Sequence, residues 1–333
     1  MLPSNPSFAI VGSGAIGSYY GGRLAQSGLP VHFLLRSDYD HVRAHGLKIT
    51  SIAGDFHLAP SHLNIYRSTA DMPKVDIVLV TLKSTDNPAL ADLIPPLLHE
   101  STAIITLQNG LGNEDHLASL FGAHRIIGGV AFTCINRLSP GVISHTDHGH
   151  IHLSDWYLAP REHTGGARSA ASPTPNQQDP SRAILLAHLF TQSRIPTTPV
   201  DNILFTRWSK LTWNIPFNGL TTILDVPTDQ LIATPEAIHL IEQIIQEIIQ
   251  TAAATGIHLP PDIAARQIRL TQSMGPYLTS TQLDRRHRRP LELESLFLKP
   301  LAVARLHEIP VPRLQMLSYL LESINNATSK RTS

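Results

Sequence analysis

The sequence is poor in cysteine, in charge of one sign and in long apolar runs. Its single cysteine, Cys134, excludes an internal disulfide framework and any cysteine-rich metal site. Lys and Arg together number 26, as do Asp and Glu, so the formal net charge is zero. This balance argues against nucleic acid or an acidic membrane surface as the main partner. No run approaches the roughly 18 apolar residues of a membrane-spanning helix.

The first residues also lack the basic and apolar regions of a secretory signal peptide. We therefore expect a cytoplasmic protein that has no membrane partner. The 333 residues are enough for two domains, each with a sizeable core. Within such a core, Cys134 is expected to act as a small apolar residue of a strand.

A glycine-rich turn near the N-terminus is the strongest functional signal. The apolar run Phe8–Val11 leads directly into a Gly-x-Gly-x-x-Gly pattern, and a helix-compatible run follows. This strand–turn–helix context is typical of dinucleotide sites, in which the pyrophosphate lies at a helix N-terminus. Gly12 permits the tight turn, Gly14 lets backbone amides approach the pyrophosphate, and Gly17 lets the helix pack on the strand. The expected cofactor contacts are Gly12, Ser13, Gly14, Ala15, Ile16 and Gly17.

Arg36, at the end of the second strand pattern Val31–Leu35, bears on which dinucleotide binds. A carboxylate at this place binds the ribose hydroxyls of NAD, whereas a guanidinium can bind the 2′-phosphate of NADP bidentately. We therefore expect NADPH as the cofactor. Asp38 lies two residues further on and argues for NADH, so this choice needs structural evidence.

Strand and helix patterns alternate through the first half of the chain, as a doubly wound parallel sheet requires. We expect an α/β, Rossmann-like cofactor domain over residues 1–200 and an all-α substrate and catalytic domain over residues 201–333. Residues 160–180 hold almost no large apolar side chains, so a flexible insertion is expected there.

Two apolar runs, Val75–Leu82 and Ala103–Leu107, are typical of strands buried on both faces. Lys83 follows the first run, and Asn109 lies just beyond the second. Ligands of such sheets bind at the carboxyl ends of strands, so both side chains are expected to line the cofactor crevice. Further along, short β patterns suggest hairpins that close this domain, at 126–133, 141–145 and 150–154.

Three polar residues with helical spacing stand out in the second half. Lys210, Asn214 and Asn218 lie four residues apart and share one helix face among apolar neighbours. Buried polar groups are costly unless they are satisfied, so the stripe is either a packing network or a binding site. A lysine held partly away from water suits a general acid, with two amides that position a substrate. Pro216, between the asparagines, should kink the helix.

A second polar segment runs from Ser280 to Glu294 and has basic residues at its centre. The basic run is either a solvated loop or an attractor of an anionic substrate. Pro290 can open a helix whose first turn carries Glu292 and Glu294, where acidic side chains suit the helix dipole.

The order and spacing of these motifs resemble those of the ketopantoate reductases (2-dehydropantoate 2-reductases) over nearly the whole chain. No single motif is diagnostic, but together they are specific. The matching segments are residues 12–17, Leu35-Arg36, Val80-Thr81-Leu82-Lys83, Gln108 to Gly112, Trp208 to Leu211 with Asn214 and Asn218, and Ser280, Asp284 and Pro290-Leu291-Glu292.

The resemblance implies an NADPH-dependent reduction of a 2-keto acid to a 2-hydroxy acid, with 2-dehydropantoate and pantothenate biosynthesis as the expected substrate and pathway. It implies that Lys210 donates a proton to the keto oxygen and that Glu292 forms hydrogen bonds around the active site. Arg36 and Lys83 match residues at the adenosine-phosphate end, and Asn109 matches one near the nicotinamide and the lysine. The implied substrate contacts are Asn109, Asn214, Asn218 and Ser280.

Other readings stay open at this point. Pro216 and Glu294 depart from the family pattern, which leaves a different keto acid as the alternative substrate. A protein that senses NADP(H) without turnover is a second alternative, and a homodimer is also open. A third alternative is a metal site on a histidine-rich strand, but no cysteine and no clear carboxylate partner is placed with its residues, so no metal is expected; they are His145, His148, His150 and His152.

Overall fold

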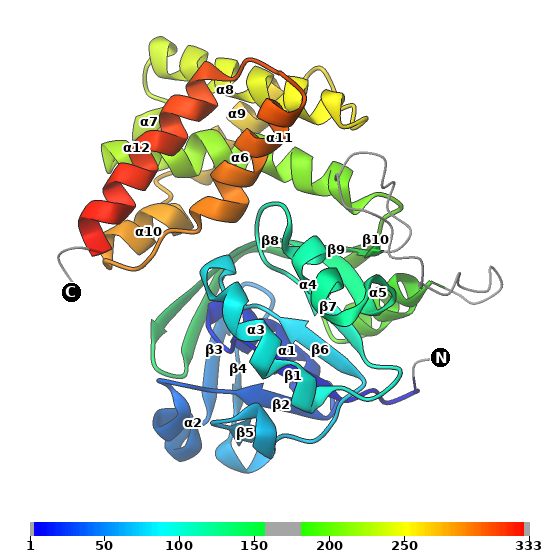
Figure 1. The fold of residues 1–333 in the computed structure, drawn as a ribbon. Coiled ribbons are helices and arrows are strands. Elements are labelled where there is room, and N and C mark those ends of the chain that lie inside the picture. Colours follow the sequence, from blue (N-terminus) through cyan, green and yellow to red (C-terminus); the bar gives the residue numbers. More distant parts are fainter. Residues whose placement is uncertain (1–2, 157–180, 330–333) are drawn as a thin grey trace. The chain divides into compact units, whose positions relative to one another are not determined.

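The computed structural model describes residues 3–156 and 181–329 (Figure 1). The predicted insertion at 160–180 therefore lies outside the described residues. The described chain divides into two compact units. The sheet unit comprises residues 3–108, 113–156 and 181–203, and the helical unit comprises residues 109–112 and 204–329.

The described part of the sheet unit is built on a ten-stranded sheet with the order β4-β3-β9-β8-β7-β6-β1-β2-β5, and β10 also pairs with β9. The strands are β1 (Phe8–Val11), β2 (Val31–Leu34), β3 (Leu47–Ser51), β4 (Phe56–Leu58), β5 (Asn64–Tyr66), β6 (Ile77–Val80), β7 (Ala103–Thr106), β8 (Ile126–Ser139), β9 (Val142–Asp155) and β10 (Thr197–Pro199).

The half of the sheet from β5 to β8 is parallel throughout, as the alternating sequence pattern predicts. Every residue of β1, β6 and β7 is buried, which explains their continuous apolar sequences. Beyond β8 the pairing becomes mixed, because β9 runs antiparallel to β8 and β4 antiparallel to β3. The helices of this unit are α1 (Ala15–Gln26), α2 (Tyr39–His45), α3 (Leu90–Leu93), α4 (Asn113–Phe121) and α5 (Arg182–Gln192).

The β8–β9 hairpin differs from the three short β patterns in the sequence, because it consists of two strands of 14 residues each. The register between them shifts after Phe132, after Cys134 and after Arg137. Within β9, His148 and Gly149 both have positive φ, at 59° and 109°. This local change of direction interrupts the alternation of apolar and polar residues, so one strand looks like two in the sequence. Cys134 is buried here, as expected.

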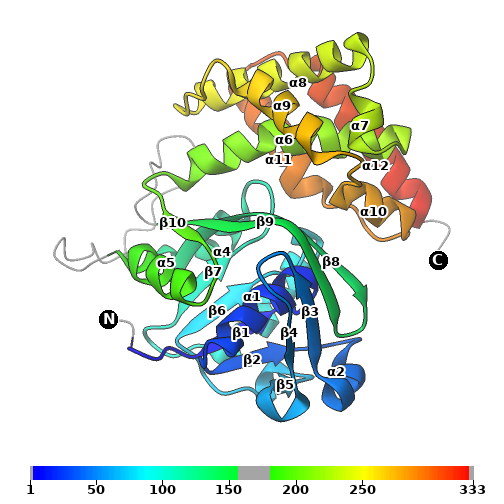
Figure 2. The same cartoon turned by 180° about the vertical axis from the view of Figure 1, so that it is seen from behind.

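The described residues of the helical unit contain helices and no strand, as predicted. Figure 2 shows these helices gathered around α6. Their apolar faces form one core, to which α8 contributes the isoleucines of its amphipathic stripe. The helices are α6 (Ile203–Leu224), α7 (Thr228–Leu231), α8 (Pro235–Ala254), α9 (Ile263–Met274), α10 (Ser280–Arg286), a π-helix (Glu294–Leu298), α11 (Lys299–Leu306) and α12 (Pro312–Ser329).

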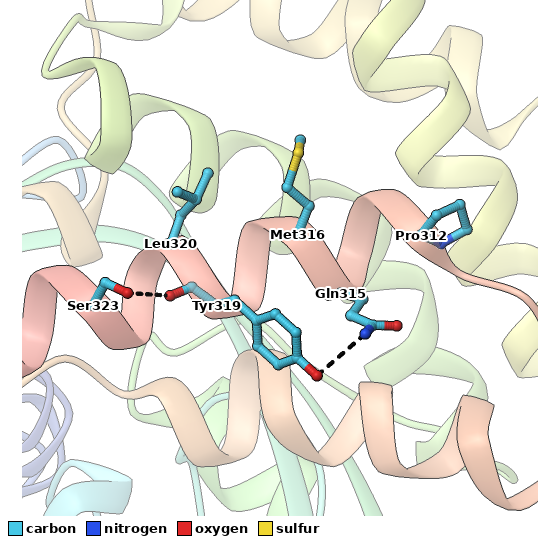
Figure 3. A pocket seen from close by; sticks show the side chains of 6 residues that line it. All are labelled: Pro312, Gln315, Met316, Tyr319, Leu320 and Ser323. Atoms are coloured by element: carbon cyan, nitrogen blue, oxygen red, sulfur yellow. Dashed lines mark hydrogen bonds between the residues drawn. The ribbon is translucent and has the colours of Figure 1, made fainter.

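One face of α12 carries apolar side chains that are open to solvent (Figure 3). Met316 and Leu320 lie on this face, and the hydroxyl of Tyr319 accepts hydrogen bonds from Gln315 and Arg305. A shallow pocket without charged lining lies here, formed by Pro312, Gln315, Met316, Tyr319, Leu320 and Ser323. Across the described ranges, no helix is both long and apolar enough to cross a membrane.

Candidate active site

The glycine-rich turn has the tight geometry that its sequence predicts. Gly12 has φ of 111°, and a Cβ at this position would lie 2.3 Å from the backbone nitrogen of Leu82. The carbonyl oxygen of Gly12 accepts a hydrogen bond of 2.7 Å from the hydroxyl of Thr81. The turn after β1 is thus fastened to the chain that leaves β6, and glycine is required at position 12.

The start of α1 is open to a ligand. A Cβ at Gly17 would lie 2.4 Å from the oxygen of Gly12, so close packing of helix and strand requires this glycine. Gly14 is exposed and serves as the N-cap without a side chain, and Ser13, Ala15 and Ile16 are half-buried. The first backbone amides of α1 consequently have no side-chain cap, which suits them to bind an anion such as a pyrophosphate.

Two residues just beyond β2, Arg36 and Asp38, are the candidates to contact the cofactor at its ribose, and they differ in exposure. Arg36 is exposed, whereas Asp38 is buried. The carboxylate of Asp38 accepts hydrogen bonds from Arg137, from the hydroxyl of Ser37 and from the backbone amide of Gly141. Asp38 is therefore turned toward the β8–β9 hairpin, whereas Arg36 is an exposed ionic group at this strand end.

Polar residues also follow β6 and β7. Lys83 is half-buried and lies three residues beyond β6. Gln108, beyond β7, accepts from the hydroxyl of Thr106 at 3.1 Å and donates to Asn87 at 2.7 Å. Asn87 in turn donates to Asn113 at 3.1 Å. This chain of amides fixes the strand end that precedes Asn109.

The short segment from Asn109 to Gly112 belongs to the helical unit. Buried Arg207 of α6 donates to the oxygen of Gly110 at 2.9 Å, and the amide of Leu111 donates to the oxygen of Ser295 at 2.9 Å. A Cβ at Gly110, where φ is 84°, would lie 2.2 Å from that same oxygen of Ser295. The segment thus requires glycine and is held by α6 and the π-helix.

Lys210 and Asn109 meet in this unit, with Nζ of Lys210 donating to Oδ1 of Asn109 at 2.7 Å. Asn214 and Asn218 follow on α6, with exposed fractions of 6% and 3%. Within the described parts of the chain, neither side-chain amide makes a hydrogen bond. Amide groups of this kind can each donate and accept a hydrogen bond, so this pair suits a binding role.

The two predicted site residues that follow α9 differ in exposure, since Ser280 is exposed and Glu292 is buried. Ser280 is exposed and begins α10, whose N-cap is the buried Thr279. The hydroxyl of Thr279 also forms a hydrogen bond of 2.9 Å with that of Thr221 on α6. Glu292 is 8% exposed but precedes the helix that begins at residue 293, so the prediction that Pro290 opens a helix carrying Glu292 in its first turn is wrong.

The basic run begins in α10 with Arg285 and Arg286 and continues into an exposed turn, residues 287–289, so the predicted solvated loop describes its second part. Arg285 donates to the backbone oxygens of Thr222 and Ile223 at the C-terminal end of α6. Arg286 pairs with Asp225 at 2.7 Å, and another pair, at 2.8 Å, joins Arg289 to Asp284. Arg285 and Arg286 therefore fasten α10 to the end of α6, because guanidinium donors satisfy the last carbonyls of a helix, whereas Arg289 pairs with a residue of α10 itself.

Three histidine rings of β9, those of His148, His150 and His152, cluster beside the ring of Phe132. The ring of His150 lies 4.7 Å from that of Phe132 and 5.5 Å from that of His152. Burial lowers the pKa of His152 and also that of His145, whose Nδ1 lies 2.8 Å from the hydroxyl of Ser51. Among the described residues, no group of three or more histidine, cysteine or acidic side chains is arranged to hold a metal.

The chain matches a known protein family along most of its length. The family model described as ketopantoate reductase PanE/ApbA matches residues 8–157, and that of its C-terminal part matches residues 202–325. A 2-dehydropantoate 2-reductase of Nostoc sp. (strain PCC 7120 / SAG 25.82 / UTEX 2576) is 36% identical over 98% of this chain and 98% of its own length.

Two solved structures show the same arrangement of elements. The 2-dehydropantoate 2-reductase of Geobacter metallireducens GS-15 has a TM-score of 0.87 and 41% identity, covering 95% of this chain and 99% of its own. A D-mandelate dehydrogenase with NADH and anilino(oxo)acetate has a TM-score of 0.83 and 22% identity, covering 97% of this chain and 99% of its own. The second likeness is one of fold alone.

Proposed function

We propose a specific reaction for this chain, which belongs to the ketopantoate reductase family of oxidoreductases. The reaction is the NADPH-dependent reduction of 2-dehydropantoate to pantoate, a step of pantothenate biosynthesis. The observation that carries the proposal is the hydrogen bond from Lys210 to Asn109, on a helix face that also holds Asn214 and Asn218, two mostly buried residues whose amides make no hydrogen bond with the described residues.

The residues of the sheet unit suit an NADP-type dinucleotide. The amides that begin α1 would hold the pyrophosphate, in a turn where added Cβ atoms at Gly12 and Gly17 would clash. Arg36 would bind the 2′-phosphate, because it is exposed while Asp38 is engaged elsewhere. Lys83 would add positive charge at the same end. When bound, the nicotinamide supplies the hydride.

Lys210 would be the general acid. As a hydride reaches the carbonyl carbon, negative charge develops on the keto oxygen, and an ammonium donor stabilises this charge and gives up its proton. Asn109 holds the Nζ atom of Lys210 in one place, because its amide oxygen accepts a hydrogen bond from the ammonium. An interaction that strengthens as charge develops accelerates the reaction rather than only binding the substrate.

The remaining residues would hold the substrate. Asn214 and Asn218 can each donate and accept a hydrogen bond, which suits the carboxylate and the hydroxyl of 2-dehydropantoate. Ser280, exposed at the start of α10, would add a hydroxyl. Glu292 would accept a hydrogen bond from the substrate hydroxyl and help to orient the reacting group. These roles are proposals that rest on location and chemistry.

Purified protein should oxidise NADPH in the presence of 2-dehydropantoate, and a panel of other 2-keto acids tests the substrate. Faster turnover of another 2-keto acid would assign that acid as the substrate and leave the proposed reaction type unchanged. Dinucleotide binding without turnover of any acid would favour a sensing role instead. The homodimer and the cytoplasmic location stay predictions, which light scattering and cell fractionation test.

A further inference from the structure

Four polar groups come together where β2 ends, all within the sheet unit. Arg36 and Ser37 are exposed, whereas the side chain of Asp38 is only 7% exposed. Arg137, near the end of β8, reaches this corner with a side chain that is 40% exposed. The chain thus places a carboxylate within two residues of the arginine proposed to bind the 2′-phosphate.

Three donors hold the carboxylate of Asp38 in place. A guanidinium nitrogen of Arg137 donates to Oδ1, and the hydroxyl of Ser37 donates to the same oxygen at 2.8 Å. The amide of Gly141 donates to Oδ2 at 3.3 Å. The same nitrogen of Arg137 lies 3.4 Å from the hydroxyl oxygen of Ser37. Both carboxylate oxygens therefore accept hydrogen bonds, and among the described residues the charged partner of Asp38 is Arg137.

An uncompensated carboxylate beside a phosphate site would weaken the binding of a phosphate and leave ribose hydroxyls unaffected. A buried carboxylate is also weakly screened by solvent, so its charge acts over a longer distance than that of an exposed one. The ion pair with Arg137 removes this repulsion locally.

We propose that Arg137 is a determinant of cofactor specificity, because it neutralises Asp38 and so permits the 2′-phosphate of NADPH to bind at Arg36. The inference rests on the proposed NADPH-dependent function. In it, Arg137 is a positioning residue, which affects cofactor binding through Asp38. It explains how this chain can carry an aspartate close to the end of β2 and still accept a phosphorylated ribose.

A double-mutant cycle tests the proposal, using the dissociation constants of NADPH and NADH measured by calorimetry. Arg137→Gln leaves the charge of Asp38 unpaired, and we expect NADPH binding to weaken about 10-fold while NADH binding changes less than about twofold. Asp38→Asn should keep NADPH binding or strengthen it. The double variant should return NADPH binding to within about threefold of the wild type. Arg43→Gln, on the exposed surface of α2, is the control for loss of one positive charge.

Equal weakening of both cofactors in Arg137→Gln, or a double variant that stays as weak as Arg137→Gln, would overturn the inference. If Arg137→Gln does not fold, the double variant is compared with Asp38→Asn, and equal NADPH binding by these two is expected. A fall in the double variant would contradict action through Asp38. Tighter binding of NADH than of NADPH by the wild-type protein would instead overturn the proposed cofactor. This outcome is distinguishable from failure of the Arg137 proposal, because it is measured on the wild type alone.

Discussion

The ammonium of Lys210 and the amide oxygen of Asn109 lie 2.7 Å apart, although 101 positions separate the two residues in the sequence. The bond joins α6 to a segment that is itself held by Arg207 and Ser295. Lys210 therefore has a defined position before any substrate binds. Such preorganisation is what a general acid requires, because the donor need not be oriented during the reaction.

Asn109→Ala should lower kcat and leave NADPH affinity nearly unchanged. A hydrogen bond to a charged group contributes roughly 1.5–3 kcal/mol, so its loss corresponds to about a 10- to 150-fold fall if it serves the transition state. Steady-state kinetics and a binding titration on the same variant separate the two effects. A raised KM with kcat unchanged would show that Asn109 only binds the substrate.

Arg36→Ala should weaken NADPH far more than NADH, since NADPH alone carries the 2′-phosphate. A charge-assisted contact of roughly 1.5–3 kcal/mol predicts a loss of about 10- to 150-fold in NADPH binding. Arg43→Ala, on the exposed surface of α2, is the matched control. Equal losses for the two cofactors would mean that Arg36 does not contact the phosphate.

Two neighbouring threonines of α6 give a matched test of packing in the helical unit. The hydroxyl of Thr221 bonds to that of Thr279 and to the oxygen of Phe217, whereas the buried hydroxyl of Thr222 has no partner among the described residues. Thr221→Val should lower the free energy of unfolding by about 1–3 kcal/mol, and Thr222→Val should be neutral or stabilising. Urea unfolding of both variants measures these changes. Equal changes in the free energy of unfolding would contradict the assignment of a stabilising hydrogen bond to Thr221 alone.

Stability should fall as the solution becomes mildly acidic. Burial lowers the pKa of four histidines below the ordinary value of 6.5, namely His32, His124, His145 and His152. Because the unfolded chain then binds more protons than the folded one, their contribution is complete above 6.5 and is lost as pH falls toward the lowered values. Urea unfolding should therefore give a smaller free energy at about pH 5.5 than at about pH 7.5.

A pair of variants assigns part of this effect. His145→Gln should flatten the dependence on pH, because His145 is buried, whereas the exposed His62 should leave it unchanged when replaced by glutamine. A free energy of unfolding that is constant over this range, or the same slope in both variants, would contradict the assignment.

The sequence predicts much of the sheet unit because its central strands are buried on both faces and have continuous apolar runs, as in β6 and β7. It also predicts the shared face of Lys210, Asn214 and Asn218, since helical spacing fixes that face. The β9 strand was misjudged because positive φ at His148 and Gly149 interrupts its alternation. The strand β5 carried too short a pattern to be recognised.

Other parts of the candidate site depend on contacts between distant segments. The proximity of Asn109 to Lys210 followed from the family resemblance, since no local pattern encodes a contact over such a separation. The pairing of Arg285 with the end of α6 was missed, because a basic run alone does not show which carbonyls it meets. Thr279 carried a usable signal, as threonine is favoured at a helix N-cap.

Single-turnover and steady-state oxidation of NADPH with 2-dehydropantoate, comparing wild-type protein with Lys210→Ala, tests the central claim most directly. Lys74→Ala, an exposed lysine of the sheet unit, serves as control. The account predicts that the wild type and the control turn over, and that Lys210→Ala loses about 10²- to 10⁴-fold in kcat with NADPH affinity nearly unchanged. Wild-type kcat in Lys210→Ala would contradict the account, because Lys210 would then be a structural residue.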